Sequence, residues 1–334
     1  MRARGSSSKL RAMTTPGVEV VAPSRLHFGM FSFGRTDRRQ FGGVGVMIDR
    51  PGLRLRISSA ERFGVRGPLA ERARAVIRRL AEAWQLETLP ECQLEIVTAP
   101  PDHVGLGTGT QLALAISAGL NAWRNVPPLA APELAALAGR GDRSAIGTYG
   151  FQHGGFLVEA GKLPGEALSP LEHRVELPEA WRFVLISPNT QRGLSGEAER
   201  RAFGELPPVP EETTARLRHE VTEELLPAAK SGDFERFSRS LYRFGYEAGT
   251  CFAARQGGPF AGPSIARLVE TIRRTGVPGV GQSSWGPTVF ALLPDQYAAG
   301  QFAEAMRRHT EPDDAITISP VNNTGARVER TNTA

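Results

Sequence analysis

The stretch Pro101-Asp102-His103-Val104-Gly105-Leu106-Gly107-Thr108-Gly109-Thr110-Gln111 decides the fold, because it joins a strand to a helix through a glycine-rich turn. The preceding residues Cys92–Thr98 alternate apolar and polar side chains, which predicts a half-buried strand. After the turn, Leu112, Ile116 and Leu120 recur at helical spacing with small residues between them. Such a turn lets a ligand approach the backbone closely, and the N–H groups of the first helical turn attract anions. The stretch therefore predicts a phosphate-binding loop.

An ordinary strand-to-helix loop explains the same residues, because glycine turns with tight dihedrals are common. The stretch is not a P-loop, since no Gly-Lys-Ser/Thr follows, and it lacks the full dinucleotide-binding fingerprint. The three glycines alone leave both interpretations open.

Two further stretches favour the phosphate-binding interpretation. Ala22-Pro23-Ser24-Arg25-Leu26-His27-Phe28-Gly29 lies near the start of the chain, and Gly279-Val280-Gly281-Gln282-Ser283-Ser284-Trp285-Gly286-Pro287-Thr288 lies near its end. In order and spacing, the three stretches resemble the motifs of the GHMP kinase superfamily (galactokinase, homoserine, mevalonate and phosphomevalonate kinases). The residues of these motifs resemble one branch of the superfamily more closely, the β-ribofuranosylaminobenzene 5'-phosphate synthase family. The resemblance covers the chain from Val18 to Ser319, and the third motif is its most specific part.

The composition is that of a globular protein. The chain has 334 residues, of which 40% are hydrophobic and 22% charged, and is long enough for two domains that share a cleft. Its net charge of +5 suits an anionic small molecule or a solvated basic surface, and no basic run with interleaved aromatics indicates nucleic acid. Cys92 and Cys251 have no metal-ligand spacing, and we expect them to be reduced and buried, as in a cytoplasmic protein. No apolar stretch is long enough to cross a bilayer.

The order of strands and helices predicts an α+β protein of two layered domains. We expect a disordered tail at residues 1–17, a first domain with the phosphate-binding loop at 18–185, a second domain at 186–320 and a flexible tail at 321–334. Met13 is an alternative start. The resemblance implies a GHMP kinase-like fold, in which an N-terminal domain like the second domain of ribosomal protein S5 and a ferredoxin-like C-terminal domain hold the ligand between them.

Periodicity and turn residues place the individual elements. Arg140–Thr148 is expected to be a polar loop, and a turn at Pro23–Arg25 is expected to separate the first two strands. Strands are expected at Val18–Ala22, Leu26–Phe33, Gly42–Ile48, Leu53–Ser58, Gly155–Ala160, Trp181–Ser187, Thr288–Leu293 and Ala315–Ser319. Helices are expected at Leu69–Trp84, Pro132–Ala138, Glu211–Lys230, Asp233–Phe252, Ser264–Thr275 and Ala298–His309.

Two features depart from the kinases of the superfamily. Many members carry two adjacent serines after Gly-Leu-Gly, one of which helps hold the metal, whereas this chain has Thr108-Gly109. Several members place an aspartate shortly after a Ser-Gly pair, whereas Ser144–Thr148 has no carboxylate there and Asp142 precedes it. Homoserine kinase-like members work without that aspartate, so an ATP-dependent small-molecule kinase remains one alternative. A non-catalytic ligand-binding relative is another, because a fold does not settle a function.

The resemblance to the synthases implies a condensation of 5-phosphoribosyl 1-diphosphate with 4-aminobenzoate or a related aromatic acid, in the biosynthesis of tetrahydromethanopterin-type cofactors. The ring carbon that bears the carboxylate attacks the anomeric carbon, diphosphate leaves, and loss of carbon dioxide restores aromaticity. This chemistry needs a phosphate cradle, cations for the leaving diphosphate and a dry pocket for the ring. The family also implies Mg²⁺ and a homodimer, whereas the sequence identifies no metal ligands.

The candidate site residues come from the three motifs and from two polar loops. Backbone donors at 105–110 would bind phosphate, arginines would bind charge, and Trp285 or Phe28 would stack on the acceptor ring. The catalytic candidates are Arg25, His27, Arg192 and Glu197. The substrate-binding candidates are Ser24, His103, Gly105, Leu106, Gly107, Thr108, Gly109, Thr110, Arg143, Ser144, Ser195, Gln282, Ser283, Ser284 and Trp285.

Each candidate side chain also has a purely structural interpretation. His27 and Trp285 are consistent with core residues, and His103 is consistent with a solvent-facing side chain. Residues 282–284 are consistent with caps of a turn. Arg192, Ser195 and Glu197 are consistent with an exposed loop.

Overall fold

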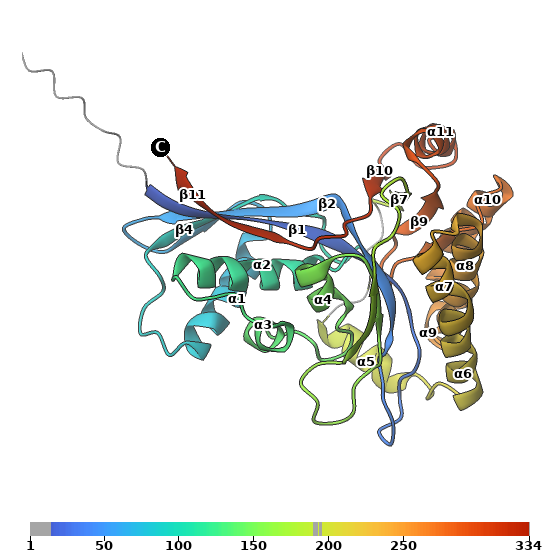
Figure 1. Cartoon of the computed structure of the whole chain (residues 1–334), viewed down its shortest axis with the longest axis horizontal. Helices are drawn as coiled ribbons and strands as arrows, with labels where there is room; N and C mark the ends of the chain where they lie inside the picture. The colour runs from blue at the N-terminus through green and yellow to red at the C-terminus, as the bar shows by residue number, and fades with distance from the viewer. Residues whose placement is uncertain (1–14, 190–192, 194–195, 334) are drawn as a thin grey trace, which may run out of the picture.

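The computed structural model describes residues 15–189, 193 and 196–333, and the side chains of 15–16, 194–200 and 332–333 lie outside that description (Figure 1). Two sheets organise the chain. The first has the order β11-β1-β2-β4-β3, with β5 paired to β2 and β6 paired to β5, and the second has the order β10-β7-β9-β8. The strands are β1 (Thr15–Met30), β2 (Gly43–Ser59), β3 (Gly64–Arg66), β4 (Cys92–Thr98), β5 (Phe156–Glu159), β6 (Leu171–Val175), β7 (Arg182–Ser187), β8 (Val280–Gln282), β9 (Val289–Leu293), β10 (Ala315–Pro320) and β11 (Arg327–Thr333).

The helices divide between the two sheets. Figure 1 shows α1 to α4 on one side of the first sheet and α6 to α11 at the other end of the molecule, beside the second sheet. The helices are α1 (Ala70–Ala83), α2 (Thr108–Trp123), α3 (Ala131–Ala138), α4 (Ile146–His153), α5 (Gly196–Glu205), α6 (Glu211–His219), α7 (Leu226–Ser231), α8 (Phe234–Thr250), α9 (Ala253–Gln256), α10 (Gly262–Arg274) and α11 (Gln296–Met306), with a π-helical segment at Glu220–Leu225 between α6 and α7.

The second sheet has ferredoxin-like topology. In chain order its strands are β7, β8, β9 and β10, and helices lie between the first two and between the last two. The spatial order is therefore fourth, first, third, second, and all pairs are antiparallel, which is the β-α-β-β-α-β arrangement. The expected α+β fold with a ferredoxin-like second domain is confirmed.

Strand β1 runs through the first motif without a turn. The sequence predicted two strands separated by Pro23–Arg25, but Thr15–Met30 is one strand whose pairing with β2 shifts register between Ala22 and Ser24 and again between His27 and Gly29. A shift of this kind bends a strand and redirects its side chains, and such irregularities are frequent beside functional sites. Proline is tolerated at this irregularity, and the segment between the two shifts carries Arg25 and His27.

Three buried clusters hold the fold together. One packs the first sheet against α1 to α3, and another packs the second sheet against α10 and α11. The largest joins the two halves: Leu26 and Phe28 of β1 pack with Phe183 of β7, Phe290 of β9 and Phe244 of α8. Burial of these rings fixes β1 against the second sheet, and the site lies along that junction.

Several predicted boundaries are wrong. The end of the chain is not a loose tail, because β11 pairs antiparallel with β1 from Thr15↔Thr333 to Val21↔Arg327. The polar loop after Arg140 ends earlier than expected, because α4 begins at Ile146. Helix α5 and the short strands β3, β6 and β8 were not predicted. Within the part of the chain that is described, no helix combines the length and the apolar character needed to cross a membrane.

Truncation after Pro320 tests the role of β11. If the last residues form a strand, their removal exposes the edge of β1 and abolishes backbone hydrogen bonds worth about 1 kcal/mol each. We expect a loss of at least about 2 kcal/mol of unfolding free energy, or about 3 °C in Tm for a chain of 334 residues. Starting the chain at Met13 is the control, since it removes a similar number of residues and no described strand. Equal melting temperatures for the two truncated chains would contradict this assignment.

Candidate active site

The glycine-rich loop forms one end of a cavity of about 580 Å³. Gly107 has φ of 71° and stands immediately before α2, and its carbonyl accepts hydrogen bonds from the N–H groups of Thr110 and Gln111. The Thr108 hydroxyl donates to the carbonyl of Pro101 at 3.0 Å, which closes the loop on itself. Residues 105–110 all line the cavity. The first turn of α2 thus faces an open space, as an anion-binding helix terminus must.

The first motif contacts the glycine-rich loop directly. The Arg25 N–H donates to the Leu106 carbonyl at 3.0 Å, and the Arg25 side chain lies against Gly107. A side chain at Gly107 would bring its Cβ within 3.1 Å of Arg25 Nε. Positive φ and this close approach together favour glycine at position 107.

The third motif is locked onto the other two. The Ser283 hydroxyl donates to the Gly105 carbonyl at 2.7 Å and accepts from the His27 N–H at 3.1 Å. The Ser284 N–H donates to the His27 carbonyl at 3.0 Å. At Gly286 a Cβ would lie 2.2 Å from the Gly105 nitrogen, so the two glycine turns touch backbone to backbone. All three sequence motifs therefore meet at one place.

Four arginines line the cavity beside the glycine-rich loop: Arg25, Arg72, Arg140 and Arg143. Arg72, from α1, pairs with Asp102, whose Oδ2 also lies 3.3 Å from His103 Nε2. Arg140 Nη2 donates to the Gly109 carbonyl at 2.8 Å, while its buried Nε has no hydrogen-bond partner in the described structure. Burial, and then the nearby charges of Arg72 and Arg79, lowers the pKa of Arg140.

Partly buried cations are stabilised by anions, whether these are protein carboxylates or a bound ligand. Among the described residues, the carboxylates that line this cavity are Asp102, which pairs with Arg72, and Asp142. Cationic side chains next to a helix N-terminus favour a ligand that carries several negative charges. We call this space the arginine cavity.

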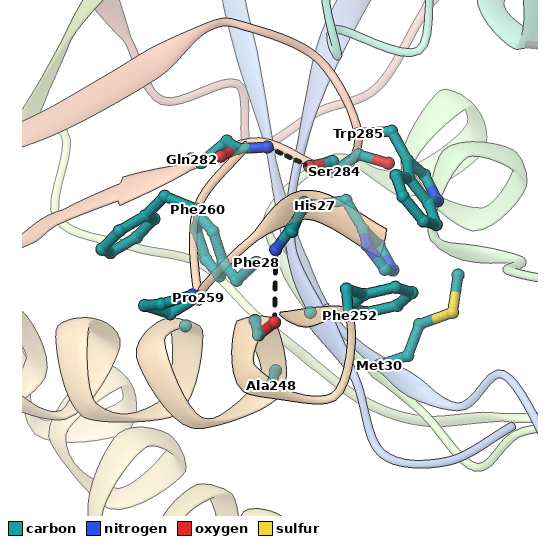
Figure 2. A pocket seen from close by; sticks show the side chains of 14 residues that line it. His27, Phe28, Met30, Ala248, Phe252, Pro259, Phe260, Gln282, Ser284 and Trp285 are labelled. Carbon is teal, nitrogen blue, oxygen red and sulfur yellow. Dashed lines mark hydrogen bonds between the residues drawn. The ribbon is translucent and has the colours of Figure 1, made fainter. Parts of the chain in front are cut away.

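A second, smaller cavity of about 50 Å³ adjoins the first, and we call it the apolar cavity (Figure 2). Its walls are mainly Phe28, Phe252, Phe260, Pro259 and Ala248. Met30, Ser284 and Trp285 line both cavities. The two spaces are therefore neighbours, one cationic and one apolar, with Trp285 on the shared wall.

His27 belongs to the apolar cavity. Its side chain is 2% exposed, and its Nε2 has no hydrogen-bond partner among the residues that the structure describes. Burial, and then the charge of Arg25, holds the pKa of His27 well below its usual range, so the imidazole is neutral at neutral pH. A buried, unpaired ring nitrogen is costly, which is unusual for a core histidine.

The two candidate ring platforms differ. Phe28 is part of the core, with its ring 5.2 Å from Phe290. Trp285 is half-buried and makes edge contacts with Phe203 at 5.6 Å and Phe252 at 4.9 Å. Trp285 thus combines packing in an aromatic cluster with a position on the wall of both cavities.

Several predicted binding side chains instead hold the motifs in place. The Ser24 hydroxyl donates to Pro51 O at 2.5 Å and is buried. Gln282 accepts from Ala261 N at 2.7 Å and donates to Ser284 O at 2.9 Å, the second bond being drawn in Figure 2. Together with Ser283, these residues fit the alternative in which polar side chains stabilise turns.

Ser144 contacts Glu159, a buried carboxylate that the sequence did not identify as part of the site. Its hydroxyl donates to the carboxylate of Glu159 at 2.5 Å, and the Ala145 N–H donates to the same carboxylate at 2.7 Å. Glu159 is fully buried, and burial raises its pKa to about 7 against the opposing effect of these hydrogen bonds, of Ser169 and of Arg25. The carboxylate therefore anchors the loop that carries Arg140 and Arg143 where that loop enters α4.

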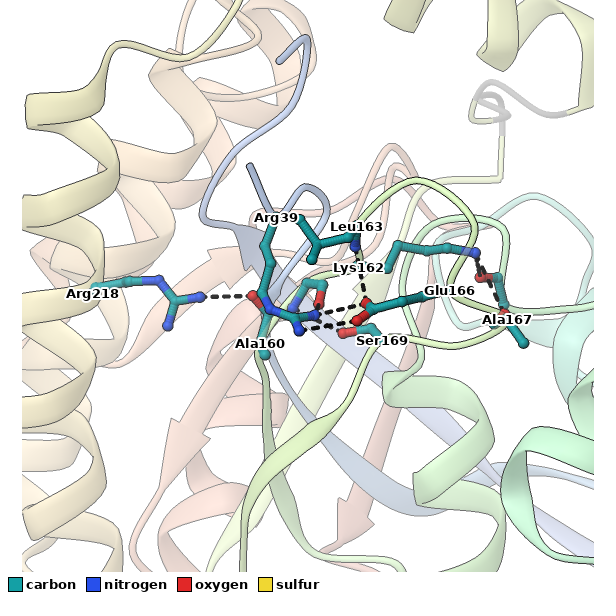
Figure 3. A network of polar contacts seen from close by, with 10 residues as sticks. Arg39, Ala160, Lys162, Leu163, Glu166, Ala167, Ser169 and Arg218 are labelled. Carbon is teal, nitrogen blue, oxygen red and sulfur yellow. Dashed lines mark hydrogen bonds and ion pairs between the residues drawn. The ribbon is translucent and has the colours of Figure 1, made fainter. Parts of the chain in front are cut away.

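A second network supports this anchor from outside (Figure 3). The Ser169 hydroxyl accepts from the Gly161 N–H at 2.8 Å, and Arg39 reaches across from the loop after β1 to pair with Glu166 at 2.7 Å. Arg218 of α6 donates to the Ala160 carbonyl at 2.7 Å. The turn that follows Glu159 is thus fixed from three directions.

The sequence also missed Arg72, Arg140, Gly193 and Gly286, which all line the arginine cavity. Arg72 lies in the helix predicted at Leu69–Trp84, and helical spacing alone does not distinguish an arginine that lines a cavity from one on an exposed helix face. The Gly193 N–H donates to His103 O at 2.7 Å. Arg192 and Ser195 lie outside the described residues, and Glu197 belongs to α5 with its side chain outside the description.

Glu159→Gln tests the buried carboxylate through pH. An acid whose pKa is raised from 4.5 to about 7 stabilises the fold when protonated. That contribution is fully present below about pH 4.5 and is lost as the pH rises through 7. In urea unfolding between pH 5 and 8, the stability of the wild type should fall relative to Glu159→Gln, by at most about 1.4 kcal/mol per pH unit. Parallel profiles would show that Glu159 is ionised throughout.

Comparison with known proteins identifies the fold family. The family model "GHMP kinases N terminal domain" matches residues 71–155, and "GHMP kinases C terminal" matches residues 225–311. A homoserine kinase structure from Cytophaga hutchinsonii aligns with a TM-score of 0.68 at 17% identity, over 98% of this chain and 100% of that one. A mevalonate diphosphate decarboxylase structure from Staphylococcus aureus gives 0.62 at 15% identity, over 94% and 98%. The expected GHMP kinase-like fold is confirmed.

Sequence relatives give a narrower grouping. The β-ribofuranosylphenol 5'-phosphate synthase of Methanothermobacter thermautotrophicus is 33% identical over 85% of this chain and 92% of its own length. The protein of the same name from Archaeoglobus fulgidus is 30% identical over 83% and 88%. Identity at this level along nearly the full length of both relatives confirms the resemblance seen in the three motifs. The chain is thus a member of the β-ribofuranosylphenol 5'-phosphate synthase family.

Proposed function

We propose that this enzyme condenses 5-phosphoribosyl 1-diphosphate with a para-substituted aromatic acid and releases diphosphate and carbon dioxide, in the biosynthesis of a methanopterin-type cofactor. The name of its relatives specifies a ribofuranosylphenol product. Decarboxylative coupling of 4-hydroxybenzoate yields a phenol, whereas 4-aminobenzoate yields an aniline. Both acids are therefore candidate acceptors, and 4-hydroxybenzoate is the one that the relatives' name favours.

The observation that carries this proposal is the contact between two unlike cavities. A phosphoribosyl diphosphate is a polyanion that suits four arginines and the N-terminus of α2. An aromatic ring suits a small space walled by Phe28, Phe252 and Phe260. Since Trp285 lines both, an anomeric carbon on one side and a ring carbon on the other would meet there.

The residues then have distinct roles in the proposed reaction. The bond between the anomeric carbon and the diphosphate oxygen breaks, and the oxygen keeps the electron pair, so negative charge develops where Arg72 and Arg140 lie. The ring carbon that bears the carboxylate forms the new bond to the anomeric carbon. The carboxylate then leaves as carbon dioxide, and its bonding electrons restore the aromatic ring. No residue has to remove a proton from carbon.

Gly109 is the position at which this chain departs from many superfamily kinases. A side chain there would bring its Cβ within 2.0 Å of Arg72 Nη2, so the guanidinium occupies the space next to the position where many superfamily kinases carry a second serine. A cation in that place binds the leaving phosphate groups directly. A serine hydroxyl that helps hold a metal has no room unless Arg72 moves.

Magnesium, which the family implies, fits this chain only in part. No group of three or more His, Cys, Asp or Glu side chains in the described structure has the arrangement of a metal site. Asp102 and Asp142 line the arginine cavity. Because Mg²⁺ is commonly held by one or two carboxylates plus substrate phosphates, we propose that it binds with the diphosphate beside Asp142. There it would neutralise charge on the leaving group. The homodimer implied by the family remains a prediction.

The direct test is an assay of carbon dioxide and diphosphate. We expect the purified protein, with Mg²⁺ and phosphoribosyl diphosphate, to release both in a 1:1 ratio from 4-hydroxybenzoate or 4-aminobenzoate labelled in the carboxyl group, without ATP. Acceptor-dependent formation of ADP from ATP would identify a kinase. Tight binding of both substrates without either product would identify a non-catalytic relative. Either result would overturn the proposal.

A further inference from the structure

We infer that the apolar cavity binds the aromatic acceptor with its para substituent hydrogen-bonded to His27 Nε2, which makes His27 the residue that selects hydroxyl- or amino-substituted acids. This inference rests on the proposed function and adds the location and orientation of the acceptor. Three observations support it: the hydrogen bonds of the polar groups that line the apolar cavity, the position of His27 on β1, and the wall that this cavity shares with the arginine cavity.

Among the polar side chains that line the apolar cavity, that of His27 is available to hydrogen-bond a ligand. Both ends of the Gln282 amide are bonded, to Ala261 N and Ser284 O. Gln256 Nε2 donates to the carbonyls of Gly249 and Gly258. Only His27 Nε2 combines complete burial with the lack of a partner among the described residues that line this cavity. A ligand that completes this hydrogen bond would remove the cost of the unpaired nitrogen.

The charge state of His27 selects which end of the acceptor it meets. Because burial keeps the imidazole neutral, it offers a carboxylate no ion pair, but it can share a proton with a hydroxyl or an amino group. The carboxylate belongs with the cations of the neighbouring cavity. Figure 2 shows His27, Phe252 and Trp285 together on the cavity wall.

Strand geometry matches the length of the acceptor. Arg25 and His27 are two residues apart on β1, between the two register shifts, so their side chains emerge on one face about 6.6 Å apart. Arg25 lines the arginine cavity, and His27 lines the apolar cavity. A ring spanning the two would point its carboxylate-bearing carbon toward the phosphoribosyl group, as the coupling requires.

The cavity must widen to admit the ring. A void that holds benzene measures about 150 Å³, which is larger than the 50 Å³ seen here. Met30 lies on the wall between the two cavities, and methionine side chains change rotamer at low cost. Movement of Met30 would join the two spaces when the acceptor enters.

His27→Phe and His27→Gln test the selection of acceptor. We expect the wild type to prefer 4-hydroxybenzoate over benzoate, both in kcat/KM and in affinity measured by calorimetry with inorganic diphosphate present. His27→Phe should reduce that preference about tenfold and leave the affinity for phosphoribosyl diphosphate unchanged. His27→Gln, which keeps an amide near the position of Nε2, should retain part of the preference. Equal weakening of 4-hydroxybenzoate and benzoate in His27→Phe would overturn the assignment.

A cavity-filling variant tests the location independently of His27. Gly245 of α8 lines the apolar cavity, and a Cβ there meets only Phe28 O, at an ordinary 3.7 Å. Gly245→Leu should therefore fold and abolish acceptor binding, with little effect on phosphoribosyl diphosphate. Gly300→Leu on α11, where nothing lies within 4 Å of the new Cβ, is the matched control. Undiminished acceptor affinity in folded Gly245→Leu would place the acceptor elsewhere.

The proposed reaction and the proposed acceptor site can be tested separately. If the wild type forms no product with any acceptor, the proposed reaction is wrong, although the calorimetric preference still tests the binding site. If the wild type is active and the variants show no selective loss of acceptor binding, the reaction stands and the assignment of the apolar cavity is wrong.

Discussion

The Ser283 hydroxyl makes the interaction on which the rest of the site depends. It accepts from the backbone of His27 on β1 and donates to the carbonyl of Gly105 in the phosphate-binding loop. One buried side chain thus connects three segments that are far apart in sequence and belong to both domains. Since Gly286 packs against the Gly105 backbone with no room for a Cβ, this contact also fixes the distance between the two domains at the site. The contact between Gly286 and Gly105 therefore also positions the wall that the arginine cavity and the apolar cavity share.

That common wall separates two solvent environments. On one side, arginines and the terminus of α2 form a cationic surface that suits an anionic ligand. On the other side, phenylalanine rings exclude water and leave a neutral histidine as the unpaired polar group of the described wall. The proposed reaction expels diphosphate and carbon dioxide while joining a sugar to a ring, so it needs the two environments side by side, with the reacting carbons in contact. In the proposed reaction, Arg72, which packs against Gly109, supplies one of the cations for the leaving diphosphate.

The sequence predicts those features that depend on neighbouring residues and misses those that depend on contacts between distant segments. Local patterns predicted the glycine-rich turn, β4, β7 and α2. Alternating polarity, helical spacing and turn glycines can all be recognised within a short run of consecutive residues. The meeting of the three motifs came from the family resemblance, since spacing alone says nothing about contacts across more than 170 residues such as Gly105 with Ser283. Arg72 and Glu159 were missed because each looks ordinary in its element: one is an arginine on an amphipathic helix, the other a carboxylate at the end of a buried strand. Only tertiary structure shows that Arg72 faces the cavity and that Glu159 anchors Ser144. The strand β11 was missed because its polar residues lack an alternating pattern, and its pairing with β1 provides the order.

The central claim is that the two substrates occupy adjoining cavities at the same time. A crystal structure with Mg²⁺, inorganic diphosphate and 4-hydroxybenzoate tests it most directly, because this mixture contains no ribosyl group and cannot react. The account predicts diphosphate between Arg72, Arg140 and the first turn of α2, with the ring beyond Trp285 and its hydroxyl within hydrogen-bonding distance of His27 Nε2. A ring bound outside the apolar cavity, or two ligands that exclude each other, would contradict it.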